Sequence, residues 1–172
     1  MNLNNIEIKA RCHSLENVEH IIELYNAEFI GEDFQTDTYY LVKKGRLKLR
    51  EGNIEKSLIY YERKNESGPK RSDVELVKLD KTADLKRLLD KLFEILIVVK
   101  KKRKIYFLNN VKFHVDQVEH LGSFIEIEAI NDSGQKPQIF LRDQCNHYID
   151  LFGINKDDFI THSYSDLLLN GV

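Results

Sequence analysis

Four stretches of the chain alternate apolar residues with polar or charged ones, and this alternation limits the folds available to it. Side chains of a β-strand point to opposite faces in turn, so residues two apart share a face. In the first stretch, residues 5–11, one face would therefore hold Ile6, Ile8 and Ala10. The polar faces comprise Asn5, Glu7, Lys9 and Arg11; Arg46, Lys48 and Arg50; Lys101 and Arg103; and Glu126 and Glu128. We expect these faces to form one continuous charged surface.

The composition predicts a soluble globular domain of the usual kind. The chain has 172 residues, of which 42% are hydrophobic, and this argues against disorder. Its 26 basic and 28 acidic side chains leave a formal charge of -2, so overall charge predicts neither a nucleic-acid partner nor a membrane partner. Two cysteines, Cys12 and Cys145, are too few for a disulfide scaffold. With no secretion signal and no long apolar run, a cytoplasmic location is expected.

The periodicity along the chain predicts eight strands and three helices. The strands are expected over residues 4–13, 34–42, 45–51, 56–64, 72–80, 97–108, 110–118 and 123–130. Helices are expected from Ser14 to about Ala27, from about Thr82 with an apolar stripe reaching Leu96, and over 137–152, with a short turn over 163–169. Turn residues near 45, 52 and 109 predict antiparallel neighbours. No repeat or linker marks a boundary, so residues 1–172 are expected to form a single domain.

The fold class expected is α+β, with an antiparallel eight-stranded β-barrel and flanking helices. If the polar faces turn inward, a barrel of this size encloses a lumen wide enough for one small ligand. Burying many unpaired cations is prohibitive, so the lumen would need water, bound anions and acidic side chains. A triphosphate with its metal would supply that compensation.

Residues 5–9, Asn-Ile-Glu-Ile-Lys, resemble the Glu-x-Glu-x-Lys signature of the CYTH superfamily, the triphosphate tunnel metalloenzymes. That superfamily includes class IV adenylyl cyclases and thiamine and inorganic triphosphatases. The likeness covers almost the whole chain, through residues 45–51, 101–103, 115–116, 124–128 and the closing Ser-Tyr-Ser-Asp-Leu-Leu of 163–168. This closing segment resembles the cyclase branch more than the triphosphatases. The sequence departs from the signature at Asn5, whose amide oxygen can bind a hard cation but carries no charge.

The resemblance implies a tunnel that binds ATP or another triphosphate together with Mg²⁺ or Mn²⁺, and it also implies a homodimer. The acids implied at the metal site are Glu7, Glu126, Glu128 and Asp116. The cations implied at the triphosphate are Lys9, Arg11, Lys48, Arg50, Arg63, Lys101 and Arg103. Lys9, Arg103 and Asp116 match the catalytic positions.

The predicted function is conversion of ATP to cyclic AMP and pyrophosphate, with the ribose 3′-oxygen attacking the α-phosphorus. The alternatives are an inorganic or thiamine triphosphatase and a module that binds polyphosphate or nucleotide without turnover. One tunnel can serve both reactions, because the outcome depends on which phosphate lies next to the nucleophile.

Some of these residues also have simpler interpretations. Lys102 and Lys104 are expected to face water, because they fall on the other face of their strand. His114 could be a base near Asp116 or a structural histidine. Both cysteines are expected to be core residues.

Overall fold

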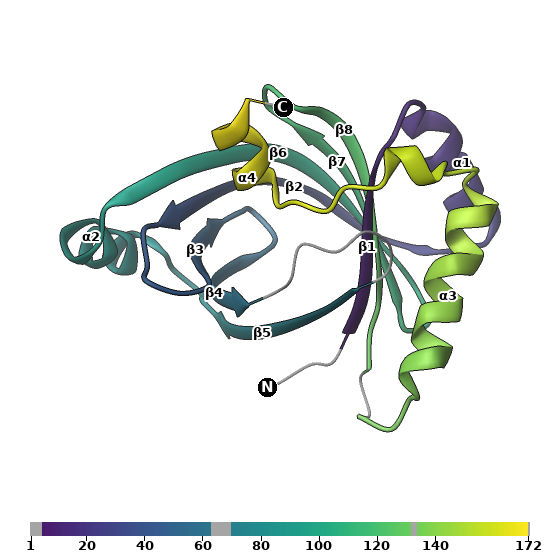
Figure 1. The fold of residues 1–172 in the computed structure, drawn as a ribbon, viewed down its shortest axis with the longest axis horizontal. Helices are drawn as coiled ribbons and strands as arrows, with labels where there is room; N and C mark the ends of the chain where they lie inside the picture. The colour runs from purple at the N-terminus through teal and green to yellow at the C-terminus, as the bar shows by residue number, and fades with distance from the viewer. Residues whose placement is uncertain (1–4, 63–69, 132–133, 172) are drawn as a thin grey trace.

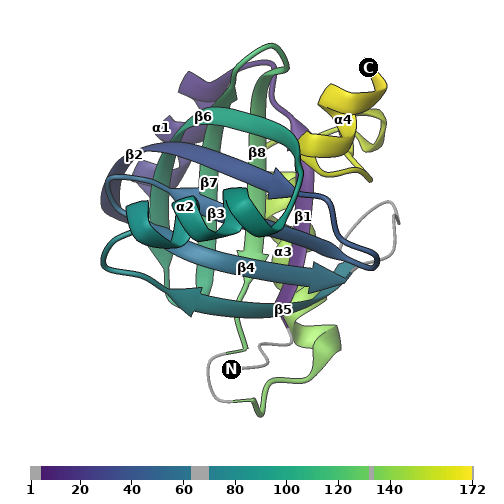
Figure 2. The same cartoon turned by 90° about the vertical axis from the view of Figure 1, so that its left-hand side faces the viewer.

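The computed structural model describes residues 5–62, 70–131 and 134–171, without the side chains of 70–73. The strands of the described chain are β1 (Asn5–Arg11), β2 (Glu28–Tyr40), β3 (Arg46–Glu51), β4 (Lys56–Glu62), β5 (Lys70–Lys78), β6 (Ile95–Leu108), β7 (Val111–Val118) and β8 (Gly122–Ala129). They close into an antiparallel barrel in the order β1-β5-β4-β3-β2-β6-β7-β8 (Figures 1 and 2). The predicted fold class is confirmed.

The helices are α1 (Leu15–Leu24), α2 (Ala83–Leu92), α3 (Gln138–Leu151) and α4 (Tyr164–Asn170), with a short 3-10 turn at Lys156–Asp158. Helices α1 and α3 lie side by side against the outside of the barrel, whereas α2 lies across another side (Figures 1 and 2). No helix in the described ranges is long and apolar enough to cross a membrane.

The two faces of β1 separate as the alternation predicts. Ile6, Ile8 and Ala10 are each at most 2% exposed and form the outer face. They pack in one core cluster with side chains of α1 and α3, which include Val18 and Cys145. Cys145 is therefore a core residue, as predicted, and the half-buried Cys12 packs against the same cluster. With the apolar face of β1 covered from outside, its polar face is left to the interior.

Helix α4 closes one end of the barrel. Its residues Tyr164 and Leu167 are buried in a cluster with interior-facing side chains such as Phe124 and Val118. The hydroxyl of Ser163 caps the helix, and Asp166 completes the capping box. This closing helix gives the interior one apolar end.

Three element boundaries differ clearly from the prediction. Helix α1 ends at Leu24 rather than near Ala27, and β2 begins at Glu28 rather than at residue 34. A bulge in the pairing of β2 with β6, between Phe29 and Gly31, breaks the period of two that would have marked this strand. Helix α2 ends at Leu92, so Leu96 belongs to β6 and not to the helix.

The turn between β3 and β4 is built around a buried carboxylate. Asp33 is fully buried and accepts hydrogen bonds from the backbone N–H groups of Ile54 at 2.8 Å and Glu55 at 2.9 Å. A Cβ atom on Gly52 would lie 2.6 Å from Asp33 Oδ2 and 2.7 Å from the Glu55 carbonyl oxygen. Only glycine therefore lets the turn and the carboxylate approach so closely.

We expect Gly52→Ala to lower the free energy of unfolding by about 2 kcal/mol, because the added methyl group must push Asp33 away from its donors. Urea unfolding measures the change. In an Asp33→Ala background the same substitution should cost less, since only the close contact with the Glu55 carbonyl oxygen remains. An equal cost in both backgrounds would contradict this explanation.

Candidate functional site

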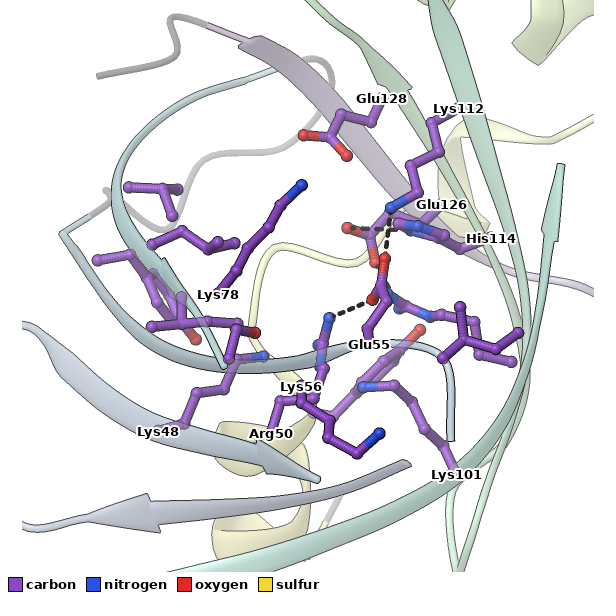
Figure 3. A pocket seen from close by; sticks show the side chains of 18 of the residues that line it. Lys48, Arg50, Glu55, Lys56, Lys78, Lys101, Lys112, His114, Glu126 and Glu128 are labelled. Carbon is purple, nitrogen blue, oxygen red and sulfur yellow. Dashed lines mark hydrogen bonds and ion pairs between the residues drawn. The ribbon is translucent and has the colours of Figure 1, made fainter. Parts of the chain in front are cut away.

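The barrel holds a cavity of about 510 Å³, a size that suits a small-molecule ligand. Charged side chains from opposite walls converge on it (Figure 3). Its basic lining residues are Lys9, Lys48, Arg50, Lys56, Lys78, Lys101, Arg103 and Lys112. Its acidic lining residues are Glu7, Glu55, Asp80, Glu126 and Glu128. Lys48, Arg50, Lys101 and Arg103, on β3 and β6, form what we call the cation wall. Glu7, Glu126 and Glu128, on β1 and β8, form the carboxylate group.

Most of the residues selected from the sequence meet at this cavity. Glu7, Lys9, Lys48, Arg50, Lys101, Arg103, Glu126 and Glu128 all line it. Arg11 does not: its Nη1 donates to the Leu121 carbonyl at 3.2 Å, and its guanidinium lies over the Phe124 ring. Asp116 lies behind Arg103, outside the lining, and Arg63 falls outside the described residues. The roles predicted for all of these residues, inside the cavity and outside it, stay predictions.

Asp37, near the C-terminal end of β2, is the shared hydrogen-bond acceptor of the cation wall. It is 1% exposed and accepts hydrogen bonds from Lys48 Nζ at 2.8 Å, Arg50 Nε at 2.9 Å and Lys101 Nζ at 3.0 Å. Burial raises the pKa of the Asp37 carboxyl, but these three cations outweigh burial and hold it well below its usual range. Sequence reasoning missed Asp37 because Thr36 and Thr38 make the opposite face of the strand polar as well.

Glu55 is a second acid that the sequence did not reveal, because it lies beyond a strand end where alternation gives no signal. Its carboxylate accepts hydrogen bonds from Arg50 Nη1 at 2.9 Å and from Lys112 Nζ at 2.6 Å (Figure 3). Burial raises the pKa of Glu55, but Arg50 and Lys112 lower it by more. Arg50 is therefore held from two sides, by Asp37 and by Glu55.

Arg103 has its own buried carboxylate. Its Nε and Nη2 donate to the two oxygens of Asp116 at 2.7 and 2.6 Å, and Nη2 also lies 3.2 Å from Glu126 Oε2. Asp116 is fully buried and accepts a further hydrogen bond from the Tyr164 hydroxyl at 2.7 Å. Both oxygens of Asp116 are engaged in these hydrogen bonds. Asp116 is therefore suited to act indirectly, by orienting the guanidinium group of Arg103 toward the cavity.

The carboxylates of β1 and β8 are arranged differently. Glu7 and Glu128 are directly opposite each other across the two strands, and Lys9 is opposite Glu126. Burial and the facing Glu7 raise the pKa of Glu128 to about 7, although Asn5 Nδ2 donates to Glu128 at 2.7 Å. Burial also raises the pKa of Glu126, but Lys9 and Arg103 hold it well below its usual range.

This donor set fits a hard divalent cation. Like charges directly opposite in a sheet repel each other, and a cation between them would remove the repulsion. Carboxylate oxygens are the ligands that Mg²⁺ and Mn²⁺ prefer. In the described part of the chain, no three His, Cys, Asp or Glu side chains are already grouped to hold a metal ion.

A family model, the CYTH domain, matches residues 3–164 of this chain. The chain belongs to the CYTH family. This is the triphosphate tunnel family, which acts on triphosphate substrates and depends on divalent metals.

Three relatives are informative. A Methanocaldococcus jannaschii protein named as a candidate adenylate cyclase is 26% identical over 180 residues, which cover 94% of this chain and 97% of that protein. A solved Pyrococcus horikoshii protein is 28% identical with a TM-score of 0.78, over 95% of this chain and 98% of its own. A solved Hippeastrum protein is 16% identical, with a TM-score of 0.66, over 97% of this chain and 96% of its own. Its description names a dominant triphosphatase activity. At that identity the Hippeastrum likeness shows the fold alone.

We expect Glu128→Gln to stabilise the metal-free protein at high pH. The pKa of Glu128 is raised from 4.5 to about 7, so the folded state binds more protons in that window and stability falls as pH rises through it. The variant lacks this penalty, and its free energy of unfolding at pH 8 should exceed that of the wild type by about 3 kcal/mol. The gain should shrink toward zero at pH 5, as followed by urea unfolding.

Glu119→Gln is the matched control, because Glu119 is exposed beyond the end of β7. It should change stability little at either pH. A pH-independent effect of Glu128→Gln would contradict the like-charge interpretation of Glu7 and Glu128.

We expect Asp37→Asn to lower the free energy of unfolding at pH 7 by about 3–5 kcal/mol, because it leaves three buried cations without their shared carboxylate. The matched control is Asp150→Asn on the exposed side of α3, which should change stability by no more than about 0.5 kcal/mol. Chemical unfolding of both variants measures the difference. Equal stabilities would show that Asp37 does not hold the cation wall together.

Proposed function

We propose that this protein is a metal-dependent enzyme that converts ATP to cyclic AMP and pyrophosphate. The observation that carries the proposal is one cavity lined by eight basic side chains, with the carboxylates of Glu7, Glu126 and Glu128 together on β1 and β8. A triphosphate carries about four negative charges near neutral pH, so it requires several cations and a metal in one place. The cavity offers both.

The cations are suited to hold the triphosphate in one orientation. Arg50 and Arg103 have rigid guanidinium groups that can contact two phosphate oxygens at once. Asp37 and Asp116 already fix these groups, so little reorganisation is needed when charge develops on the leaving pyrophosphate. Lys9 of β1, whose Nζ lies 3.6 Å from Glu126 Oε2, adds a point charge beside the carboxylates. Lys9, Arg103 and, acting through Arg103, Asp116 are the residues we assign to catalysis.

Glu7, Glu126 and Glu128 are the residues that would hold Mg²⁺ or Mn²⁺. When bound, such an ion withdraws charge from phosphoryl oxygens and so eases phosphoryl transfer. The side chains of β1 and β8 then have the task of placing that charge beside the triphosphate. Arg103, 3.2 Å from Glu126, links the carboxylate group to the cation wall.

The cavity also has an apolar side, which favours a nucleotide over inorganic tripolyphosphate. Ile59 and Tyr61 of β4, Val74 and Leu76 of β5, and Leu79 line it. A bare polyphosphate would gain nothing from this surface, whereas a base and ribose can cover it. With the nucleoside on that side, the ribose 3′-oxygen is available to attack the α-phosphorus, and pyrophosphate leaves along the cations.

Hydrolysis of the terminal phosphate is the second candidate. The Hippeastrum protein, whose description names a dominant triphosphatase activity, has the same fold, so this fold can accommodate that reaction. The same cations would serve it, with water as the nucleophile in place of the ribose hydroxyl.

Product analysis distinguishes these functions. The protein is incubated with ATP, thiamine triphosphate or tripolyphosphate, each with Mg²⁺ and with Mn²⁺. Cyclic AMP with pyrophosphate from ATP supports the proposal, and orthophosphate supports the hydrolase instead. Binding of a triphosphate without any product would mean a binding module and would overturn the proposal.

We expect Arg103→Lys to reduce kcat/KM for ATP at least about 100-fold, because lysine keeps the charge but loses the fork that contacts both Asp116 and phosphate. Glu126→Gln should cause a loss of similar size. Lys102→Ala is the control, since Lys102 lies on the outer face of the same strand and pairs with Glu32 at 3.1 Å. Steady-state kinetics compares the three variants. Equal losses in Lys102→Ala and Arg103→Lys would contradict the assignment.

A further inference from the structure

His114 is a buried histidine whose hydrogen-bonding capacity is unused. It lies on β7, is 3% exposed, and lines the cavity (Figure 3). Neither of its ring nitrogens has a hydrogen-bond partner among the described residues. Its Nδ1 lies 4.0 Å from Glu126 Oε1, which is too far for a hydrogen bond. Buried polar atoms in native proteins nearly always have a partner, so the missing one calls for an explanation.

The surroundings of His114 indicate what the missing partner is. His114 is opposite Glu126 across β7 and β8, and Glu126 is opposite Lys9 across β8 and β1. Lys112 precedes it by two residues on the same face of β7, and Arg103 lies on the neighbouring strand. Whether neutral or protonated, an imidazole ring keeps at least one N–H donor. A donor among cations is complementary to an anionic oxygen.

We infer that His114 is a further substrate-binding residue, whose ring N–H donates a hydrogen bond to a phosphate oxygen of the triphosphate in the cavity. The inference rests on the proposed function, because it assigns the ligand of the same site. A metal ion is the less suitable partner, since Mg²⁺ strongly prefers oxygen ligands. A purely structural role is also a poor match, because an aromatic ring without polar atoms would fill the same space at lower cost.

The test uses metal-free tripolyphosphate, in the presence of a chelator, as the probe of binding. His114→Phe keeps a ring of similar shape and removes both nitrogens. We expect it to weaken binding at least about tenfold while the melting temperature stays the same or rises, because two unpaired polar atoms are gone. His20→Phe, at an exposed position on α1, is the control and should leave affinity unchanged.

Two amide variants keep the test decisive if phenylalanine disturbs the packing. Glutamine places an N–H near the position of Nε2, and asparagine near that of Nδ1. We expect one of His114→Gln and His114→Asn to bind tripolyphosphate within about threefold of the wild type, which would also identify the donating nitrogen. Loss of affinity in all three variants together with a lower melting temperature would mean a structural role and would overturn the inference.

The outcomes separate this inference from the proposed function. If the wild type and His114→Phe bind tripolyphosphate equally well, the inference is wrong and the triphosphate site stands. If the wild type binds no metal-free tripolyphosphate, the same variants are compared with a non-hydrolysable ATP analogue and Mg²⁺. If the wild type does not bind that either, the proposed function fails and the inference fails with it. A change in the ¹⁵N chemical shifts of the His114 ring on adding tripolyphosphate would be direct support, and unchanged shifts at saturation would overturn the inference.

Discussion

The carboxylate of Asp37 accepts hydrogen bonds from Lys48, Arg50 and Lys101 inside the barrel, and the architecture of the site depends on this contact. Cations that point into a closed barrel lose their hydration, so they need fixed anions nearby. Asp37 supplies one anion and Asp116 supplies another behind Arg103. Each carboxylate offsets charge and also fixes the direction of a guanidinium group. The same contacts thus neutralise the buried cations and hold the guanidinium groups in place before a ligand binds.

The carboxylates on β1 and β8 are the counterpart of this arrangement. Glu7 and Glu128 face each other, and burial together with the facing Glu7 raises the pKa of Glu128 to about 7. The departure from the family signature at Asn5 has a physical reason in this setting. Its amide donates to Glu128 and accepts from the backbone N–H of Asn131 at 3.1 Å, so it orients the carboxylate and joins two chain segments. A glutamate here would add a further negative charge to an acidic group.

The period of two predicted which faces turn inward wherever only one face of a strand is polar, as in 5–11 and 46–50. It could not find Asp37, because β2 is polar on both faces there, nor the start of β2, because a bulge breaks the period. Glu55 was missed since its position depends on a turn folded around Asp33. Asp116 was selected, but its contacts depend on side-chain packing with α4, which no local pattern encodes. Alternation therefore predicts faces, whereas tertiary contacts decide which charges meet.

The most direct test of the account is a crystal structure of the protein with Mn²⁺ and a non-hydrolysable ATP analogue. The account predicts the triphosphate inside the barrel, in contact with Arg50 and Arg103. It also predicts an anomalous Mn²⁺ peak at the oxygens of Glu7, Glu126 and Glu128. A nucleotide bound outside the barrel, or a metal peak remote from these three carboxylates, would contradict it.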